Sequence, residues 1–262
     1  MKYVEPKTFL VGVTGITSGL KEYLEYSGNE EFLETLNQAK LEGVSDGEIL
    51  CSFYAKLCYK SLTLGKNQNV TKIRDIESNI MGCFDSGHGS VFEHCLLNFI
   101  TTDCSRVFTH ELVRHRVGTA YSQTSGRYVA IDNIDFIVDP LLIVDPECDL
   151  AIQEHIHATE KLAKFLRDKL IKDGDNFDKK KKVTSAIRRI APNGQSNEIG
   201  FSMNIRTLRQ TLVARVSEHA EWEINLIFAQ IYDIVYSKWP LMLYNLEKVK
   251  LDNGLFKVRP IK

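Results

Sequence analysis

One segment of the sequence concentrates side chains that suit the binding of an anion. Residues 109–128 read THELVRHRVGTAYSQTSGRY and combine cations with hydroxyls and a glycine. Guanidinium groups hold phosphate oxygens in pairs, and hydroxyls and loop amides can fill the remaining acceptors. A solvated helix end is the alternative, since cations favour a helix C-terminus. The ordered Ser-Gln-Thr-Ser-Gly-Arg-Tyr that follows the cations favours a binding site.

The residues before these cations predict the element that positions them. The run SRVFTHELV indicates a helix whose apolar face carries Val107, Leu112 and Val113. This helix would end at Arg-His-Arg and open into a polar, glycine-containing loop. We therefore expect the cations to project into a cleft.

A second polar cluster lies in residues 204–224, NIRTLRQTLVARVSEHAEWEI. At 100° per residue, one helical stripe carries Asn204, Leu208, Leu212, Arg215 and His219. Because the leucines should face inward, Arg215 is expected near the interior, where a guanidinium needs an anionic partner or a ligand. An internal salt bridge would instead use one of three nearby acids, Glu218, Glu221 or Glu223. Arg206 and Gln210 share a different face, and His219 beside Trp222 equally suits a packed core histidine.

The composition limits the class of protein. The 262 residues are 44% hydrophobic and 26% charged, as in an ordinary soluble domain with a sizeable core. A net charge of −1 argues against nucleic acid as a partner, and the four lysines at 179–182 fit a solvated helix start. The six cysteines form no CxxC pair and read as reduced thiols, so we expect a cytoplasmic protein with no metal site. No signal peptide or membrane span is expected.

The pattern along the chain predicts helices around a mainly antiparallel sheet. Strands are expected at 8–16, 91–103, 135–140 and 197–204. Helices are expected from the capping box Ser45/Glu48 to near Gly65, and over 70–84, 105–113, 147–173 and 206–248 with an interruption at Pro240. Pro192-Asn193-Gly194 is a strong turn signal. With no repeat or linker in view, residues 1–262 are predicted to form a single α+β domain.

Three blocks of the sequence resemble the flavin-dependent thymidylate synthases. They are GHGSVFEH at 87–94, RHRVGTAYSQTSGRY at 114–128 and NIRTLRQTLVARVSEHAEWEI at 204–224, with AKLCYKSL at 55–62 as a weaker fourth. The resemblance implies a mixed fold that is not Rossmann-like and a homotetramer with active sites shared between subunits. It also implies reductive methylation of dUMP to dTMP, with FAD, NADPH and 5,10-methylenetetrahydrofolate.

The resemblance further implies roles for the matched residues. The flavin would be contacted by His88, Ser90, Glu93, Arg114, His115, Arg116, Gln123, Asn204, Arg206, Gln210 and His219. The nucleotide would be contacted by Glu111, Arg114, Gln123, Ser125, Gly126, Arg127 and Arg215. Arg215 would be the catalytic residue, since a buried cation beside the pyrimidine stabilises the anion that develops in the ring. Ser125 has no local His/Asp partner and is interpreted as a binding residue.

The sequence departs from the family pattern in ways that keep other activities open. Eight residues separate Arg116 from Ser125 where seven are usual, so the loop is expected to bulge or shift register. Glu111 stands where many members carry glutamine, and Glu198 where some carry arginine. A pyrimidine nucleotide hydroxymethylase of the same fold is one alternative. A non-catalytic nucleotide- or RNA-binding protein is another, although the near-neutral charge argues against RNA.

Overall fold

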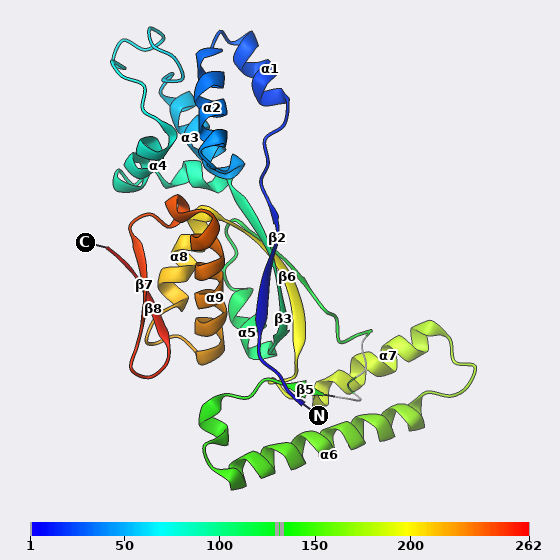
Figure 1. Ribbon diagram of the computed structural model, residues 1–262. Helices are drawn as coiled ribbons and strands as arrows, with labels where there is room; N and C mark the ends of the chain where they lie inside the picture. The colour runs from blue at the N-terminus through cyan, green and yellow to red at the C-terminus, as the bar shows by residue number, and fades with distance from the viewer. Residues whose placement is uncertain (1, 129–130, 132–133, 262) are drawn as a thin grey trace.

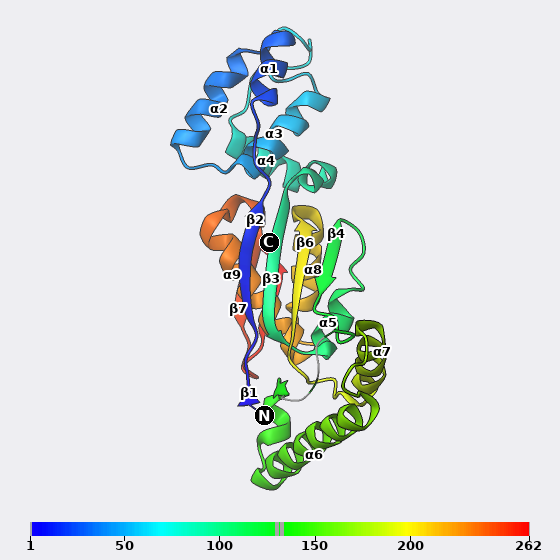
Figure 2. The same cartoon turned by 90° about the vertical axis from the view of Figure 1, so that its right-hand side faces the viewer.

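A four-stranded antiparallel sheet runs along the middle of the computed structural model, which describes residues 2–128, 131 and 134–261 (Figures 1 and 2). Its strands follow the order β2 (Lys7–Val13), β3 (Leu96–Cys104), β6 (Asn197–Asn204) and β4 (Thr119–Gln123). Side chains of successive strand residues point to opposite faces. Leu97 and Phe99 of β3 and Phe201 and Met203 of β6 therefore share the buried face.

Helices cover that buried face. They are α5 (Arg106–Leu112), α8 (Ile205–Arg215) and α9 (Trp222–Lys238) (Figure 1). A turn η4 (Pro240–Leu243) and the hairpin β7 (Leu246–Lys250) and β8 (Phe256–Pro260) follow α9 and pack beside it. On the opposite face of β2, Phe9, Val11 and Val13 remain 43%, 58% and 48% exposed. The sheet is thus covered on one side only.

Four helices and a 3-10 turn form a layer beyond the end of the sheet where β3 begins (Figure 1). They are α1 (Gly19–Tyr26), α2 (Glu31–Leu41), α3 (Asp46–Cys58), α4 (Ile76–Asp85) and η1 (Gly89–His94). A small core of Leu24, Phe32, Phe53 and Leu62 holds α1, α2 and α3 together. Helix α3 begins with the predicted capping box, in which the Ser45 hydroxyl and the Glu48 carboxylate bind each other's backbone N–H groups.

A second layer lies at the other end of the sheet (Figure 2). It contains β1 (Lys2–Tyr3), β5 (Asp135–Phe136), η2 (Pro140–Ile143), α6 (Pro146–Leu170), α7 (Phe177–Ile187) and η3 (Arg188–Ile190). Ile134, Ile156, Ala163 and Ile187 pack as a separate core between α6 and α7. In the described part of the chain no helix combines the length and apolarity needed to cross a membrane.

The predicted α+β class with a mainly antiparallel sheet is confirmed, and most element positions agree. The turn at Pro192-Asn193-Gly194 forms, with the Gln195 N–H donating to the Pro192 carbonyl at 3.1 Å. The lysines 179–182 lie near the start of α7, which Asn176 caps. In α5 the buried positions are Phe108, Thr109 and Leu112, whereas Val107 and Val113 are more than a third exposed.

Several predicted boundaries are wrong. The strand predicted over 91–103 begins only at Leu96, because Val91 and Phe92 are buried one after the other in a 3-10 turn, which strand alternation does not allow. Two predicted helices are shorter: α3 ends at Cys58 rather than near Gly65, and α4 starts at Ile76 behind its cap Asp75. The helix predicted over 206–248 breaks at Val216 and ends at Lys238, after which the chain forms a hairpin.

A buried carboxylate joins the start of α9 to the start of α5. Glu223, 2% exposed, accepts hydrogen bonds from the Ser105 N–H at 2.7 Å and from the Ser105 hydroxyl. The same hydroxyl caps α5 by accepting from the Phe108 N–H. Burial raises the pKa of Glu223 to about 7 and outweighs the two hydrogen bonds from Ser105, which lower it.

This raised pKa predicts a pH dependence of stability. Glu223 binds a proton more tightly in the folded chain than in the unfolded chain, so its contribution is intact below about pH 4.5 and is lost as the pH rises through 7. The loss amounts to about 3 kcal/mol in the free energy of unfolding. We expect Glu223→Gln, whose amide can still accept from the Ser105 N–H, to remove this part of the profile in urea unfolding between pH 4.5 and 8.

The exposed Glu154→Gln on α6 provides the matched control, since it removes a carboxylate with no buried partner. Its profile should follow that of the unmodified protein. If the difference between Glu223→Gln and the unmodified protein does not change with pH, Glu223 is ionised in the fold and the assignment is wrong.

Candidate active site

The Arg-His-Arg segment forms a turn directly behind α5. Hydrogen bonds from the Arg114 and His115 N–H groups to the Glu111 and Leu112 carbonyls continue the helix by one irregular turn. The His115 carbonyl then accepts from the Thr119 hydroxyl at 2.6 Å and from the Tyr121 hydroxyl. The backbone of His115 is therefore fixed by β4, while Arg114 and Arg116 extend into solvent.

The His115 ring faces the last turn of α8 and contacts Arg215. The Arg215 Nε donates to His115 Nε2 at 2.9 Å, and its Nη1 donates to the Glu111 carboxylate at 2.9 Å. Arg215 and Glu111 side chains are 25% and 30% exposed, so the pair is half-buried and open on one side. The acid that pairs with Arg215 is thus Glu111, and not Glu218, Glu221 or Glu223, which were considered for an internal salt bridge.

The direction of the Arg215 hydrogen bond fixes the protonation of His115. Since Nε2 accepts, the ring proton must lie on Nδ1, which is 3.5 Å from the Thr211 hydroxyl oxygen. That hydroxyl donates in turn to the Thr207 carbonyl at 2.8 Å. Burial, and next the Arg215 charge, lower the pKa of His115. A neutral histidine therefore holds a permanent cation in place.

The turn is attached to the start of α8 as well. The Asn204 side chain caps α8 by accepting from the Thr207 N–H at 2.9 Å, and the Asn204 N–H donates to the Gly118 carbonyl at 3.0 Å. The Thr207 hydroxyl donates to the Val117 carbonyl at 2.8 Å. Gly118 has a φ of +68°, and a Cβ there would lie 2.1 Å from Asn204 Nδ2. Only glycine fits this position.

A second group of predicted residues lies at the start of α8, where η1 packs against it. Arg206 Nη1 pairs with the Glu93 carboxylate at 2.6 Å, and its side chain runs close to Gly89. The His88 ring stacks on Tyr59 with centroids 6.1 Å apart. Ser90 and Gln210, which are close to these residues in the sequence, are exposed. The structure therefore brings His88, Glu93 and Arg206 to one region.

The third group follows β4. Gln123 Nε2 donates to the Thr109 hydroxyl at 3.2 Å, and the Ser125 hydroxyl accepts from the Arg127 N–H at 3.3 Å. A Cβ on Gly126 would lie 3.3 Å from Arg106 Nη2 and 3.6 Å from Arg188 Cδ. The Arg106 guanidinium and the methylene stem of Arg188 thus lie beside Gly126, and both arginines line a small cavity of about 40 Å³ there.

Neither Arg106 nor Arg188 was among the site residues predicted from the sequence. The available signal was the pair Arg188-Arg189 just before the Pro192-Asn193-Gly194 turn, which feeds β6. The Asn193 carbonyl accepts from the Arg106 N–H at 2.9 Å, so this turn itself joins the two arginine-bearing segments. The contact between segments about 80 residues apart could not be read from their spacing.

The first two groups lie at opposite ends of α8 within one chain. Arg206 and Arg215 are nine residues apart on α8, a rise of roughly 14 Å along the helix. The predicted stripe does not extend to His219, because α8 ends at Arg215 and the His219 side chain is 88% exposed beside Glu218. His219 is also no packed core histidine. Strand β4 pairs with β6 without a register shift, so the expected bulge does not lie within Thr119–Gln123.

Comparison with known proteins decides the family. Residues 40–241 match the model of the thymidylate synthase complementing protein family. The flavin-dependent thymidylate synthase of Clostridium tetani is 32% identical over 192 residues, 70% of this chain and 76% of that protein. Those of Mycolicibacterium gilvum and Mycobacterium avium are 30% and 32% identical over 79% of this chain and 83% of each relative.

The chain belongs to this family. The resemblance predicted from the three motifs is thereby confirmed, and with it membership of a family of enzymes. All three groups of predicted site residues fall within the segment that matches the family model. Among the described residues no cluster of three His, Cys, Asp or Glu side chains is arranged to hold a metal ion.

The Gly118 contact generates a prediction. Gly118→Ala should destabilise the fold through the positive φ, which costs roughly 1 kcal/mol, and through the clash with Asn204, which adds about as much again or more. Gly174→Ala is the matched control, because Gly174 has a φ of +85° and nothing within 4 Å of the added Cβ. Thermal unfolding of both variants should show a clearly larger loss for Gly118→Ala. Equal losses would mean that the turn does not depend on close approach to α8.

Proposed function

We propose that residues 1–262 form one catalytic domain that methylates dUMP reductively to dTMP. The methylene group would come from 5,10-methylenetetrahydrofolate and the reducing electrons from NADPH through bound FAD. The observation that carries this proposal is the half-buried Arg215, held by neutral His115 and Glu111 in a chain whose relatives are named flavin-dependent thymidylate synthases.

The Arg215 cation suits the chemistry of a uracil ring. Carbon–carbon bond formation at the ring requires it to become electron-rich, and a fixed cation beside a ring carbonyl stabilises the developing negative charge. Preorganisation matters here, because a cation already held in place needs no reorientation during the reaction. Thr211 and His115 provide that fixation in the chain itself. Without a nucleotide, the Glu111 carboxylate compensates the positive charge of Arg215. A bound anionic nucleotide would share the interaction with this cation.

The residues present fit a flavin cofactor. Arg114, Arg116 and Arg206 are exposed cations that can pair with a pyrophosphate, and the His88–Tyr59 stack offers aromatic faces to a flat ring system. When bound, FAD supplies the hydride, and the protein supplies orientation and electrostatics. Asn204 is 4% exposed and caps α8, so its contribution to flavin binding would act through the position of this helix.

The segment behind β4 suits the nucleotide phosphate. The side chains of Arg106 and Arg188 both lie beside Gly126, and Ser125 and Arg127 extend the set of donors. No acidic side chain is among the described residues that line the small cavity beside Gly126. A phosphate dianion placed there would meet cations and hydroxyls, as guanidinium recognition of phosphate requires.

A homotetramer with shared active sites would bring the separated groups together. Arg206 and Arg215 lie at opposite ends of α8 in one chain, so we expect a second copy to complete the site. The uncovered apolar residues Phe9, Val11 and Val13 on the open face of the sheet provide surface for such an assembly. We place this oligomer in the cytoplasm because its chemistry uses reduced cofactors and its cysteines are free.

Turnover with purified, FAD-loaded protein tests the proposal. With dUMP, methylenetetrahydrofolate and NADPH, mass spectrometry should detect dTMP, whereas a hydroxymethylase would yield a product heavier by one oxygen. Arg215→Ala should keep the bound flavin absorbance yet lose at least about a hundredfold in kcat/KM, since it removes a charge that acts in the transition state. A colourless protein, or full activity in Arg215→Ala, would contradict the proposal.

A further inference from the structure

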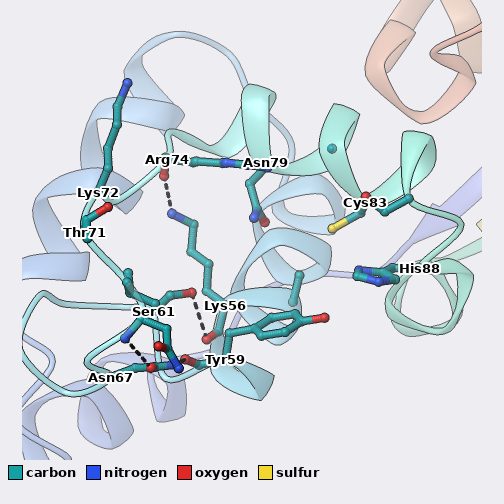
Figure 3. Close-up of a pocket in the computed structure, with 15 residues that line it drawn as sticks. Lys56, Tyr59, Ser61, Asn67, Thr71, Lys72, Arg74, Asn79, Cys83 and His88 are labelled. Carbon is teal, nitrogen blue, oxygen red and sulfur yellow. Dashed lines mark hydrogen bonds between the residues drawn. The ribbon is translucent and has the colours of Figure 1, made fainter.

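A large cavity lies between α3, α4 and the connection that joins them (Figure 3), and Arg215 is not among the residues that line it. Its volume is about 740 Å³, enough for a substantial part of a small molecule. None of the described side chains that line it is acidic, whereas three are lysine or arginine: Lys56, Lys72 and Arg74. Most of the others are amides, hydroxyls or small residues. The lining is thus positively charged and rich in hydrogen-bond donors.

Lys56 is the unusual member of this lining. It lies near the end of α3 and is 2% exposed, yet no ion pair to it is present in the described part of the chain. Its Nζ donates to the Arg74 carbonyl, as the dashed line in Figure 3 shows. An ammonium group has three donors, so two remain for a ligand. A buried charge without a counter-charge is costly and calls for an anionic partner.

The nearest carboxylate is already engaged elsewhere. Asp75 caps α4 by accepting from the Ser78 N–H at 2.7 Å and from the Ser78 hydroxyl at 2.8 Å. It acts on Lys56 only through its charge, and burial still lowers the pKa of Lys56 to about 8. The folded chain therefore leaves the Lys56 charge incompletely compensated.

The cavity adjoins the His88 motif. His88 and Tyr59, whose rings stack, both line it, and in Figure 3 they lie on one side of the space that Lys56 enters from α3. A ligand whose ring lay at His88 could extend a tail toward Lys56, Lys72 and Arg74. The cavity therefore lies where it can hold the tail of a reactant whose reacting ring is at His88.

We propose that this cavity is an anion-binding subsite, in which Lys56 holds the carboxylate or phosphate tail of a reactant that meets the flavin at His88. The identity of that reactant rests on the proposed function, which uses two candidates with such tails: the folate, with its glutamate carboxylates, and the nicotinamide dinucleotide, with its phosphates. The existence of an anion site rests on the cavity alone.

Binding of inorganic pyrophosphate to the purified full chain tests the site without reference to any reaction. Calorimetric titration should show that Lys56→Met loses one class of sites or weakens it roughly tenfold or more, as expected for a lost charge-assisted contact. Methionine keeps an unbranched apolar side chain of similar length and removes the ammonium group, whose Nζ lies 5.8 Å from the centroid of the Phe32 ring. Lys164→Met, on the exposed face of α6, is the matched control and should bind pyrophosphate as the unmodified protein does.

The double variant Lys72→Gln/Arg74→Gln tests the same site if Lys56→Met does not fold, because both residues are exposed and their loss leaves the core intact. It should also weaken pyrophosphate binding several-fold. Pyrophosphate isotherms that are unchanged in every folded variant of Lys56, Lys72 and Arg74 would overturn the proposal.

Half-reaction kinetics then distinguish the two sources of the anion. If the tail is a dinucleotide phosphate, Lys56→Met should lose the preference for NADPH over NADH in anaerobic flavin bleaching. If it is a folate tail, the variant should lose the gain in affinity from a monoglutamyl to a triglutamyl donor. A failed proposed function would appear in the unmodified protein as absent flavin or absent turnover, whereas a failed subsite leaves both normal and identical in Lys56→Met and Lys164→Met.

Discussion

The contact between Arg215 and His115 is the interaction on which the rest of the site depends. A half-buried guanidinium needs hydrogen-bond acceptors on the sides that solvent does not reach. His115 supplies one acceptor only as the neutral Nδ1–H tautomer, and Glu111 supplies the other. This single arrangement ties the turn after α5 to the last turn of α8. The position of the Arg215 cation and the protonation state of His115 therefore depend on each other.

The fold holds the C-terminal ends of α5 and α8 next to each other. Strands β3 and β6 pair directly, and each continues into one of the two helices that carry the contact, β3 into α5 and β6 into α8. At the start of α5, Glu223 of α9 binds Ser105, and at the start of α8 the Gly118 turn closes on Asn204. Helices α5 and α8 are therefore each held by contacts at their first residues. The contacts of Arg215 with His115 and Glu111 then join their C-terminal ends.

Sequence patterns predicted what local chemistry determines. The capping box at Ser45, the turn at Pro192-Asn193-Gly194 and the strand over 197–204 depend on neighbouring residues, and each appears as expected. The motif residues could be assigned to one family because their order along the chain is distinctive.

Tertiary contacts decided the remainder. Nothing local indicates that Glu111, rather than an acid on its own segment, meets Arg215, because the two are about a hundred residues apart. The helical stripe ended before His219 because Val216 is buried against the core and the chain then turns toward α9. Arg188 and Arg106 gained their place beside Gly126 only through the folding of β6 and its preceding turn. The clusters of polar residues can be predicted from the sequence, but the partners that these residues contact in the fold cannot.

Nitrogen-15 NMR of the histidine rings, with His115 assigned through His115→Gln, reports the protonation state of His115. We predict that at pH 7 His115 is neutral, with its proton on Nδ1 and an unprotonated Nε2, and that its pKa lies below the ordinary value of 6.5 because of burial and the Arg215 charge. A His115 ring that carries a proton on Nε2 at pH 7 would contradict it, because such a ring cannot accept the Arg215 hydrogen bond.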